Sequence, residues 1–458
     1  MKITMIGAGS VVFGENILTD ILTHPALRED SIICLEDIDP NRLDLMYRMM
    51  LKYKELNSEK LEGVSFEKTS DLKKCITDAK YVISSIHVGG LDAFKYDIEI
   101  PFKYGVTQCV GDTLGPGGVF RFLRQSTALK KIIEFIGEVG YQPEKDTSKP
   151  VFLNYANPMA MNTWYCNSLS PDSTIGLCHG VQGTAALLRN WIGVKPRDYS
   201  FLCAGINHLA WFLQLWYKES DDPNKVWKNA YPFLFKKLKE NPEIMGPEKL
   251  RWDMMEATGY FMTESSGHLS EYLPYYRKRT ELLDKFKGSD TFHNSLLHGE
   301  VLRFDTLEAE RVEKRLHRIL NRNKLKLKKE ASDEYASHII NAIETNKLFR
   351  FNGNVINKEG ALITNLPQNC CVEVPIFVDH HGIHPQGGIE LPTVCQALCI
   401  SNIMVQKAAV EGVLELDREK IYHAILLDPN TASICSPREV RDMVDDLFKA
   451  EKQWLPKF

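Results

Sequence analysis

Residues 2–22, KITMIGAGSVVFGENILTDIL, decide the fold class of this chain. Residues 2–6 form a short apolar run with β-branched side chains, which is typical of a buried strand, and Gly-Ala-Gly ends it. Residues 12–22 then show helical spacing. A strand, a glycine turn and a helix in that order predict the first unit of a Rossmann-type α/β fold.

The glycine turn has the chemistry of a dinucleotide site. Gly7 and Gly9 permit a tight turn and close approach of the backbone to a pyrophosphate, and Ser10 leads into the helix. The N-terminus of that helix attracts the negative charge of the phosphates. Val12 stands where a third glycine is usual, and Gly14 follows two residues later.

An acidic residue ends the second predicted strand, where a ribose would lie. We choose Asp37 over Glu36 and Asp39 as the acceptor for the ribose hydroxyls. An acid at this place disfavours the 2′-phosphate of NADP, so NAD is the expected cofactor. The alternative is an α/β fold that carries a glycine-rich turn and binds no nucleotide.

Strand and helix patterns alternate along the first 200 residues. Strands are predicted at 31–35, 64–69, 81–86, 151–154 and 175–177, and helices at 41–54, 71–79 and 121–138. This alternation predicts a doubly wound parallel sheet with helices on both faces. Later helices mix with strands such as 370–378. We therefore expect a Rossmann-type NAD-binding domain over residues 1–200 and a mixed α+β domain over 201–458.

The composition is that of a soluble globular protein. The 458 residues are 44% hydrophobic and 25% charged, with a formal charge of −4. This weak charge gives no reason to expect nucleic acid or a membrane as partner, and we interpret the basic run 314–329 as a solvated helix face. No apolar stretch approaches the ~20 residues of a membrane span. Without signal-peptide features, the cytoplasm is the expected location, with most of the 11 cysteines as free thiols.

Several distinctive residues follow predicted strands, namely Gly7, Asp37, Gly89, Asn157 and Cys178. Ligands of open α/β sheets bind at the carboxyl ends of strands, so these residues are expected to converge. Cys178 and the later His208 could share a divalent metal, because thiolate and imidazole both bind such ions. The alternative is that each is a core or capping residue. The adjacent Cys370 and Cys371 are expected to be structural.

Motifs spread along the chain resemble those of glycoside hydrolase family 4, and the closest subgroup is the melibiase-type α-galactosidases. Besides the glycine turn they are 111–118 (GDTLGPGG), 154–162 (NYANPMAMN), 178–184 (CHGVQGT), 204–208 (AGINH), 259–272 (GYFMTESSGHLSEY), 334–337 (EYAS), 365–374 (NLPQNCCVEV) and 454–456 (WLP). They cover essentially the whole chain. The resemblance implies an α-glycosidase that forms a homodimer or homotetramer through its second domain.

The resemblance also implies an NAD- and metal-dependent reaction, unlike the two-carboxylate route of most glycosidases. NAD⁺ takes a hydride from C3 of the sugar, and a base then removes the acidified proton at C2. The aglycone leaves C1 by elimination, water adds, and NADH returns the hydride. Mn²⁺ or a similar divalent ion, held by Cys178 and His208, stabilises the developing enolate.

The catalytic roles are carried over residue by residue. Tyr335 is expected to be the C2 base, with Asp112 near it to tune its basicity. His179 matches the acid that protonates the leaving oxygen, and Asn157 is expected to bind substrate hydroxyls. Structural roles remain open alternatives, because Tyr335 could pack a helix and Asp112 could cap one.

Other polar residues of these motifs leave questions open. Glu264 is an alternative C2 base, and His87 and His268 are expected to be polar residues without a catalytic role. Gly180 departs from the serine usual in melibiase-type members, and glycine here is associated with gluco- and glucurono-specific enzymes. α-Glucosidase, α-glucuronidase and α-galacturonidase are therefore alternatives to α-galactosidase, whereas the residues after Cys178 disfavour 6-phospho substrates.

Two function classes outside the family were weighed. An NAD-dependent 2-hydroxy-acid dehydrogenase would need an arginine pair and a catalytic histidine at the proper spacing, and only Arg121 and Arg124 come near this pattern. A non-catalytic NAD-binding protein would not need the Cys178 and His208 pair. Both classes explain less of the sequence than the glycosidase does.

Overall fold

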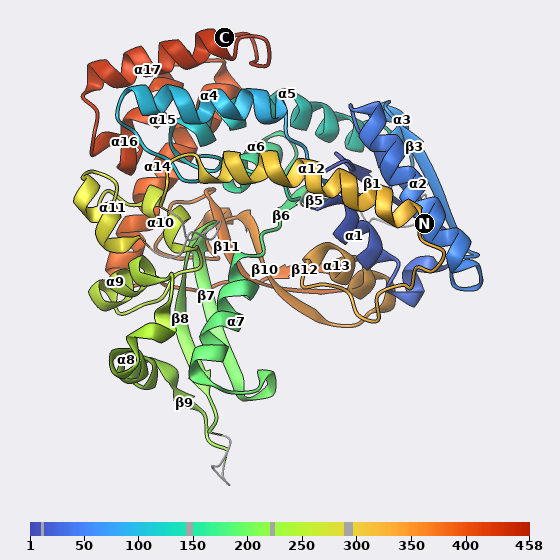
Figure 1. The fold of residues 1–458 in the computed structure, drawn as a ribbon, viewed down its shortest axis with the longest axis horizontal. Coiled ribbons are helices and arrows are strands. Elements are labelled where there is room, and N and C mark those ends of the chain that lie inside the picture. Colours follow the sequence, from blue (N-terminus) through green and yellow to red (C-terminus); the bar gives the residue numbers. More distant parts are fainter. Residues whose placement is uncertain (11–12, 143–149, 220–224, 288–295) are drawn as a thin grey trace.

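The fold is taken from a computed structural model that describes residues 1–10, 13–142, 150–219, 225–287 and 296–458. Within these residues twelve strands form one sheet, in the order β3-β2-β1-β4-β5-β6-β10-β11-β7-β8-β9, with β12 paired to β11. Helices lie against both faces of the sheet, and α17 crosses over α4 near the C-terminus (Figure 1).

The first six strands are parallel and have the Rossmann order. They are β1 (Lys2–Ile6), β2 (Ser31–Glu36), β3 (Val64–Thr69), β4 (Tyr81–Ser84), β5 (Val151–Asn154) and β6 (Thr174–Gly176). Their order, 3-2-1-4-5-6, is that of a doubly wound dinucleotide-binding sheet. The predicted fold class is therefore confirmed, and each predicted strand of this half is present within two residues of its predicted ends.

The connections between these strands are helical. They are α1 (Gly14–Ile21), η1 (Pro25–Arg28), α2 (Pro40–Leu56), η2 (Ser58–Lys60), α3 (Leu72–Ile76), α4 (Gly90–Lys103), α5 (Gly115–Val139) and α6 (Met159–Leu169). Val12, where the first helix was predicted to begin, lies outside the described residues. Helix α5 begins six residues before its predicted start at 121, because Pro116 fits a first helical turn.

Strands from the second half continue the same sheet in antiparallel pairing. They are β7 (Tyr199–Ile206), β8 (Leu209–Tyr217), β9 (Lys228–Asn229), β10 (Phe349–Ile356), β11 (Cys371–Asp379) and β12 (Gly382–Pro385). Strand β10 joins β6 through Asn354 and Gly176. The side chains that follow β6 and β7 are thereby brought to one part of the sheet.

The remaining helices surround this extension. They are α7 (Gly180–Ile192), η3 (Pro196–Asp198), α8 (Ala230–Glu240), η4 (Pro242–Met245), α9 (Lys249–Thr258), α10 (Ser266–Tyr272), α11 (Thr280–Phe286), α12 (Glu300–Leu320), α13 (Tyr335–Thr345), η5 (Lys358–Gly360), α14 (Thr393–Glu415), α15 (Arg418–Leu427), α16 (Pro429–Ala432) and α17 (Pro437–Ala450). In the described part of the chain, α14 alone has the length and hydropathy of a membrane span, and half of its apolar stretch is buried inside the protein.

Gly14 allows α1 to cross closely over the glycine turn. A Cβ atom at this position would lie 2.3 Å from the carbonyl oxygen of Ala8. Gly14 therefore supplies the close helix–strand approach that the third glycine of the usual motif provides.

Replacing Gly14 by alanine is expected to lower the free energy of unfolding by about 1–3 kcal/mol, because the added methyl overpacks a backbone contact. Gly137 in α5 is the matched control, since a Cβ there meets nothing within 4 Å. Gly137→Ala is expected to raise the stability by up to about 1 kcal/mol. Urea unfolding measures both values, and equal changes would contradict the close-approach argument.

Candidate active site

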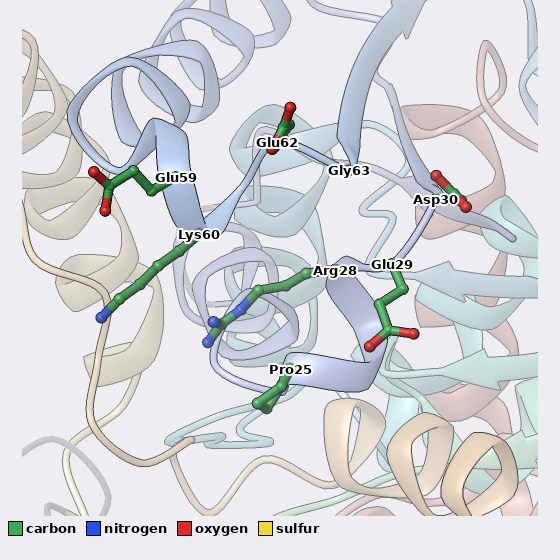
Figure 2. A pocket seen from close by; sticks show the side chains of 8 residues that line it. All are labelled: Pro25, Arg28, Glu29, Asp30, Glu59, Lys60, Glu62 and Gly63. Atoms are coloured by element: carbon green, nitrogen blue, oxygen red, sulfur yellow. The ribbon is translucent and has the colours of Figure 1, made fainter.

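One cavity lies away from the predicted site. It has a volume of about 420 Å³ and lies at the amino ends of β2 and β3 (Figure 2). Asp30 and Gly63, which line it, each directly precede the first residue of one of these strands. Ligands of doubly wound sheets bind at the opposite, carboxyl edge. The polar residues at that edge are therefore the candidates for function.

The glycine turn at the end of β1 has the geometry of a dinucleotide loop. Gly7 has a φ of 73°, in the left-handed region that favours glycine. A Cβ on Gly9 would lie 2.8 Å from Oδ2 of Asp37. The amide of Ser10 donates to the carbonyl oxygen of Gly7 at 3.0 Å, which closes the turn.

Asp37 connects this turn to the end of β2. Its Oδ2 accepts a hydrogen bond from the Gly9 amide at 2.8 Å, and its Oδ1 accepts one from the Asp39 amide at 2.8 Å. The neighbouring Glu36 is buried, and burial raises its pKa to about 7. Asp37 is half-buried beside the turn and thus better placed than Glu36 to meet a ribose.

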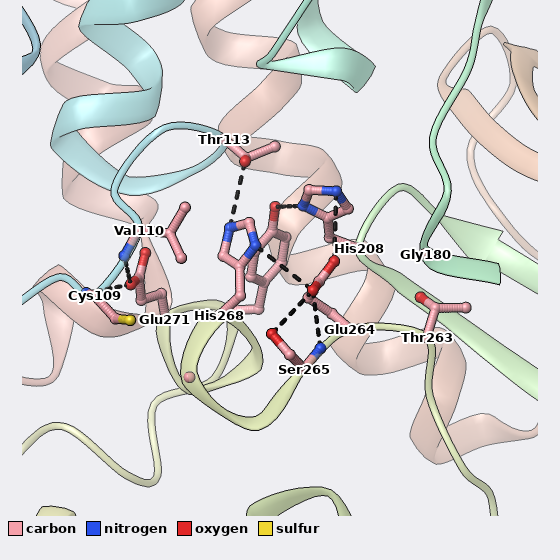
Figure 3. A network of polar contacts seen from close by, with 12 residues as sticks. Cys109, Val110, Thr113, Gly180, His208, Thr263, Glu264, Ser265, His268 and Glu271 are labelled. Carbon is pink, nitrogen blue, oxygen red and sulfur yellow. Dashed lines mark hydrogen bonds and ion pairs between the residues drawn. The ribbon is translucent and has the colours of Figure 1, made fainter. Parts of the chain in front are cut away.

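Cys178 and His208 come together although 29 residues separate them in the chain. Cys178 follows β6, and His208 lies in the turn between β7 and β8. The Sγ of Cys178 is 3.3 Å from Nε2 of His208, and Oε2 of Glu264 is 3.5 Å from the same nitrogen. Figure 3 shows His208, Glu264 and His268 turned toward one another. Ligand atoms of these three residues all lie within 4.8 Å of each other.

The electrostatics of this cluster suit a cation. Burial raises the pKa of the Cys178 thiol, and the carboxylates of Glu373 and Glu264 act in the same direction. Burial also raises the pKa of Glu373 to about 8. Asn207 is 1% exposed, yet neither atom of its amide has a hydrogen-bond partner within the described residues. A bound divalent ion with its ligands would relieve both the charge and the unmet polar groups.

Asp112 lies in a loop held by Glu271. The carboxylate of Glu271 accepts hydrogen bonds from the amides of Cys109, Val110 and Gly111. Asp112 itself pairs with Nη1 of Arg121 at 3.3 Å and accepts a hydrogen bond from Nδ2 of Asn157 at 3.0 Å. Although burial favours the neutral acid, Arg121 and His268 hold the pKa of Asp112 well below its usual range. Asp112 is therefore a carboxylate at neutral pH.

Helix α10 contributes residues that the sequence interpretation did not assign to catalysis. Nε2 of His268 is 3.3 Å from Oγ1 of Thr113, and its Nδ1 is 3.9 Å from Oε1 of Glu264. The hydroxyl of Tyr272 is 3.3 Å from Nδ1 of His208. The signal in the sequence was the spacing of positions 268, 271 and 272, which places them within one turn of a helix that follows Glu264.

Tyr335 and His179 belong to elements other than α10, because Tyr335 begins α13 and His179 directly precedes α7. Tyr335 starts α13 and packs against Phe351 with 5.3 Å between ring centroids. Burial raises its pKa, and the neighbouring carboxylate of Glu373 acts in the same direction. Nδ1 of His179 is 3.3 Å from Oε1 of Glu334, and this contact raises the pKa of His179. Burial raises the pKa of Tyr272, and the carboxylates of Glu264 and Asp112 act in the same direction.

Two family models match the chain. Family 4 glycosyl hydrolase covers residues 2–194, and the family 4 glycosyl hydrolase C-terminal domain covers residues 203–431. Among curated proteins, an α-galactosidase of Rhizobium meliloti is 38% identical over 100% of this chain and 89% of its own length. An α-galactosidase of Bacillus subtilis is 36% identical over 100% of this chain and 99% of its own length.

The fold agrees with that of solved relatives. A 6-phospho-α-glucosidase from gut microorganisms, solved in complex with NAD and Mn²⁺, superposes with a TM-score of 0.79 at 20% identity, over 100% of this chain and 99% of that one. The likeness therefore extends over the Rossmann sheet and its antiparallel extension alike. The two family models and the two full-length relatives show that the chain belongs to family 4 of the glycosyl hydrolases.

Proposed function

We propose that this protein is an NAD- and divalent-metal-dependent α-glycosidase whose preferred substrate is an α-galactoside. The observation that carries the proposal is the 3.3 Å approach of Cys178 Sγ to His208 Nε2 at the carboxyl edge of a dinucleotide-type sheet. The two full-length relatives named α-galactosidase support the choice of sugar.

The residues present fit both cofactors. The turn at Gly7 and Gly9 with Asp37 would hold NAD, and Cys178 with His208 would hold Mn²⁺ or a similar ion. When bound, NAD⁺ accepts a hydride from C3 of the sugar, and the metal stabilises negative charge that develops on the sugar oxygens. The protein residues orient the sugar and move the protons.

A tyrosine is the proposed base that removes the C2 proton, and two tyrosines qualify. Tyr335 matches the motif of relatives. Tyr272 has support from geometry, because its hydroxyl is 3.3 Å from His208, and Asp112 is among the carboxylates that add to the effect of burial in raising its pKa. Asp112 was expected beside the base, and this criterion favours Tyr272 over Tyr335.

His179 is the proposed acid for the leaving oxygen. Its side chain is 51% exposed and its Nδ1 contacts Glu334, so the ring is oriented yet accessible to a ligand. Its ring lies 6.0 Å from that of Phe13, beside the glycine turn. Asn157 is the proposed ligand of sugar hydroxyls, with Asp112 and Arg121 fixing its position.

Gly180 is the residue that makes sugars other than galactose possible substrates. Its Cβ position lies 3.6 Å from Cys178 Sγ and 3.8 Å from Glu264 Oε2, so a side chain here would enter the cluster. The absence of a side chain leaves room that α-glucosides or uronic acids could use. We also propose a cytoplasmic homodimer or homotetramer, with a boundary between its two domains near residue 200.

The decisive experiment compares p-nitrophenyl α-galactoside with the α-glucoside, α-glucuronide and α-galacturonide. Each is offered with NAD⁺, Mn²⁺ and a thiol, and then with each component left out. We expect fastest release from the α-galactoside and loss of release whenever NAD⁺, Mn²⁺ or the thiol is omitted. Release from none of the four substrates would defeat the proposed function, and faster release from another sugar would reassign the substrate.

A further inference from the structure

Glu264 has a carboxylate whose two oxygens face different partners. Oε1 accepts hydrogen bonds from the amide of Ser265 at 2.9 Å and from its hydroxyl at 3.1 Å. Oε2 faces Nε2 of His208 at 3.5 Å. The hydrogen bonds at Oε1 thus fix the carboxylate so that Oε2 faces His208 (Figure 3).

The spacing of these atoms suits a shared cation. Nitrogen and oxygen ligands about 2.1 Å from a metal lie roughly 3.0–3.5 Å apart at octahedral or tetrahedral angles. His208 Nε2 is 3.5 Å from Glu264 Oε2 and 3.3 Å from Cys178 Sγ. Both contacts converge on the same nitrogen, which makes the carboxylate and the thiolate candidate ligands of an ion beside Nε2.

The other ring nitrogen of His208 is also engaged. Nδ1 lies 3.3 Å from the hydroxyl of Tyr272, which leaves Nε2 to face the ion. A second partner of this kind is what orients a metal-bound imidazole. Hydrogen-bond partners therefore set the orientation of both side chains before any ion binds, Tyr272 for His208 and Ser265 for Glu264.

Charge and ligand type agree with the geometry. A thiolate and a carboxylate carry two negative charges, which balance a divalent cation in a buried site. A carboxylate oxygen also shifts the ligand set toward harder ions such as Mn²⁺, whereas thiolate and imidazole alone suit softer ions.

We propose that Glu264 is a third protein ligand of the metal, bound through Oε2 beside Cys178 and His208, and not the C2 base. This inference rests on the proposed function for the presence of the metal. It leaves proton abstraction at C2 to a tyrosine.

The test uses the full-length protein and metal binding, so that it does not depend on turnover. Co²⁺ is titrated into the metal-free protein, and the thiolate-to-cobalt charge-transfer band reports the ion beside Cys178. Displacement of Co²⁺ by Mn²⁺ then gives the Mn²⁺ dissociation constant. In Glu264→Gln the band is expected to persist, while the affinities for Co²⁺ and Mn²⁺ fall at least about tenfold. Removing a residue that only orients a metal ligand already lowers metal affinity by about this factor, so loss of a ligand should cost at least as much.

Asp112→Asn is the matched control, because it removes the same charge from another carboxylate near the cluster. Glu264 faces Nδ1 of His268, whereas Asp112 lies 4.0 Å from Nε2 of the same ring. It is expected to change the Mn²⁺ affinity far less than Glu264→Gln does, and Glu264→Asp should recover part of the affinity. Thermal unfolding of each metal-free variant checks that it is folded.

The outcomes separate the possible roles. Unchanged Mn²⁺ affinity in Glu264→Gln would overturn the ligand assignment, and a loss of glycosidase rate with unchanged affinity would make Glu264 the base. Absence of the charge-transfer band in the unaltered protein would remove Cys178 from the ligand set, and absence of any saturable Co²⁺ or Mn²⁺ binding would remove the metal, and with it both this inference and the metal part of the proposed function.

Discussion

Replacing Cys178 by serine is expected to abolish the metal-dependent glycosidase activity, with a fall in kcat/KM of about 10³-fold or more. A serine hydroxyl stays protonated where the thiol can ionise, so it is a poor replacement for the thiolate 3.3 Å from His208. Loss of the ion removes several kcal/mol of charge stabilisation, and about 1.4 kcal/mol corresponds to each factor of ten in rate. Release of p-nitrophenol from the α-galactoside at saturating NAD⁺ measures the effect.

Cys435→Ser is the control for this substitution. Cys435 is also a half-buried thiol, and its Sγ donates to the carbonyl oxygen of Tyr104 at 3.4 Å, a contact that serine can reproduce. This variant is expected to keep wild-type activity and the same dependence on Mn²⁺. If Cys178→Ser kept its metal-dependent activity, Cys178 would be removed from the ligand set and the cluster would need another explanation.

Tyr272→Phe is expected to lower kcat by about 10²- to 10⁴-fold, the usual contribution of a general base. The ring remains buried among the same neighbours, so the loss would report the hydroxyl beside His208. Wild-type product formed in D₂O should carry deuterium at C2, because the abstracted proton exchanges with solvent. With C2-deuterated substrate, the isotope effect should increase in Tyr272→Phe as proton removal becomes slower.

Tyr335→Phe is the comparison that decides between the two tyrosines. Its ring packs against Phe349 and Phe351, and phenylalanine would preserve that packing. We expect it to lose less than about tenfold in kcat, well below the range of a general base. The reverse ranking of the two variants would return the base to Tyr335, as the motif of relatives implies.

The Rossmann half follows from local pattern. Strands β1, β2, β3 and β5 begin where the apolar runs predicted them, because burial of a parallel strand leaves a short continuous run of apolar residues between turn signals. The pairing of Cys178 with His208 was also anticipated, since both follow strands. Helix α5 was predicted too short, and its additional first residues include the glycines at 115, 117 and 118, which have low helix propensity. In the structure a Cβ on Gly117 would lie 2.3 Å from the carbonyl oxygen of Gly111.

The sequence by itself determined the family and the glycine turn, and it made Cys178, His208 and Glu264 candidates, because each of these rests on motifs along the chain. Only the tertiary structure decided which of them meet. The antiparallel pairing of β7 with β11 and of β10 with β6 brings His208 to Cys178. Helix α10 and the segment before it then place His268, Tyr272 and Glu264 beside them. Such contacts join residues far apart in the chain through strand register and helix packing, which no local spacing specifies.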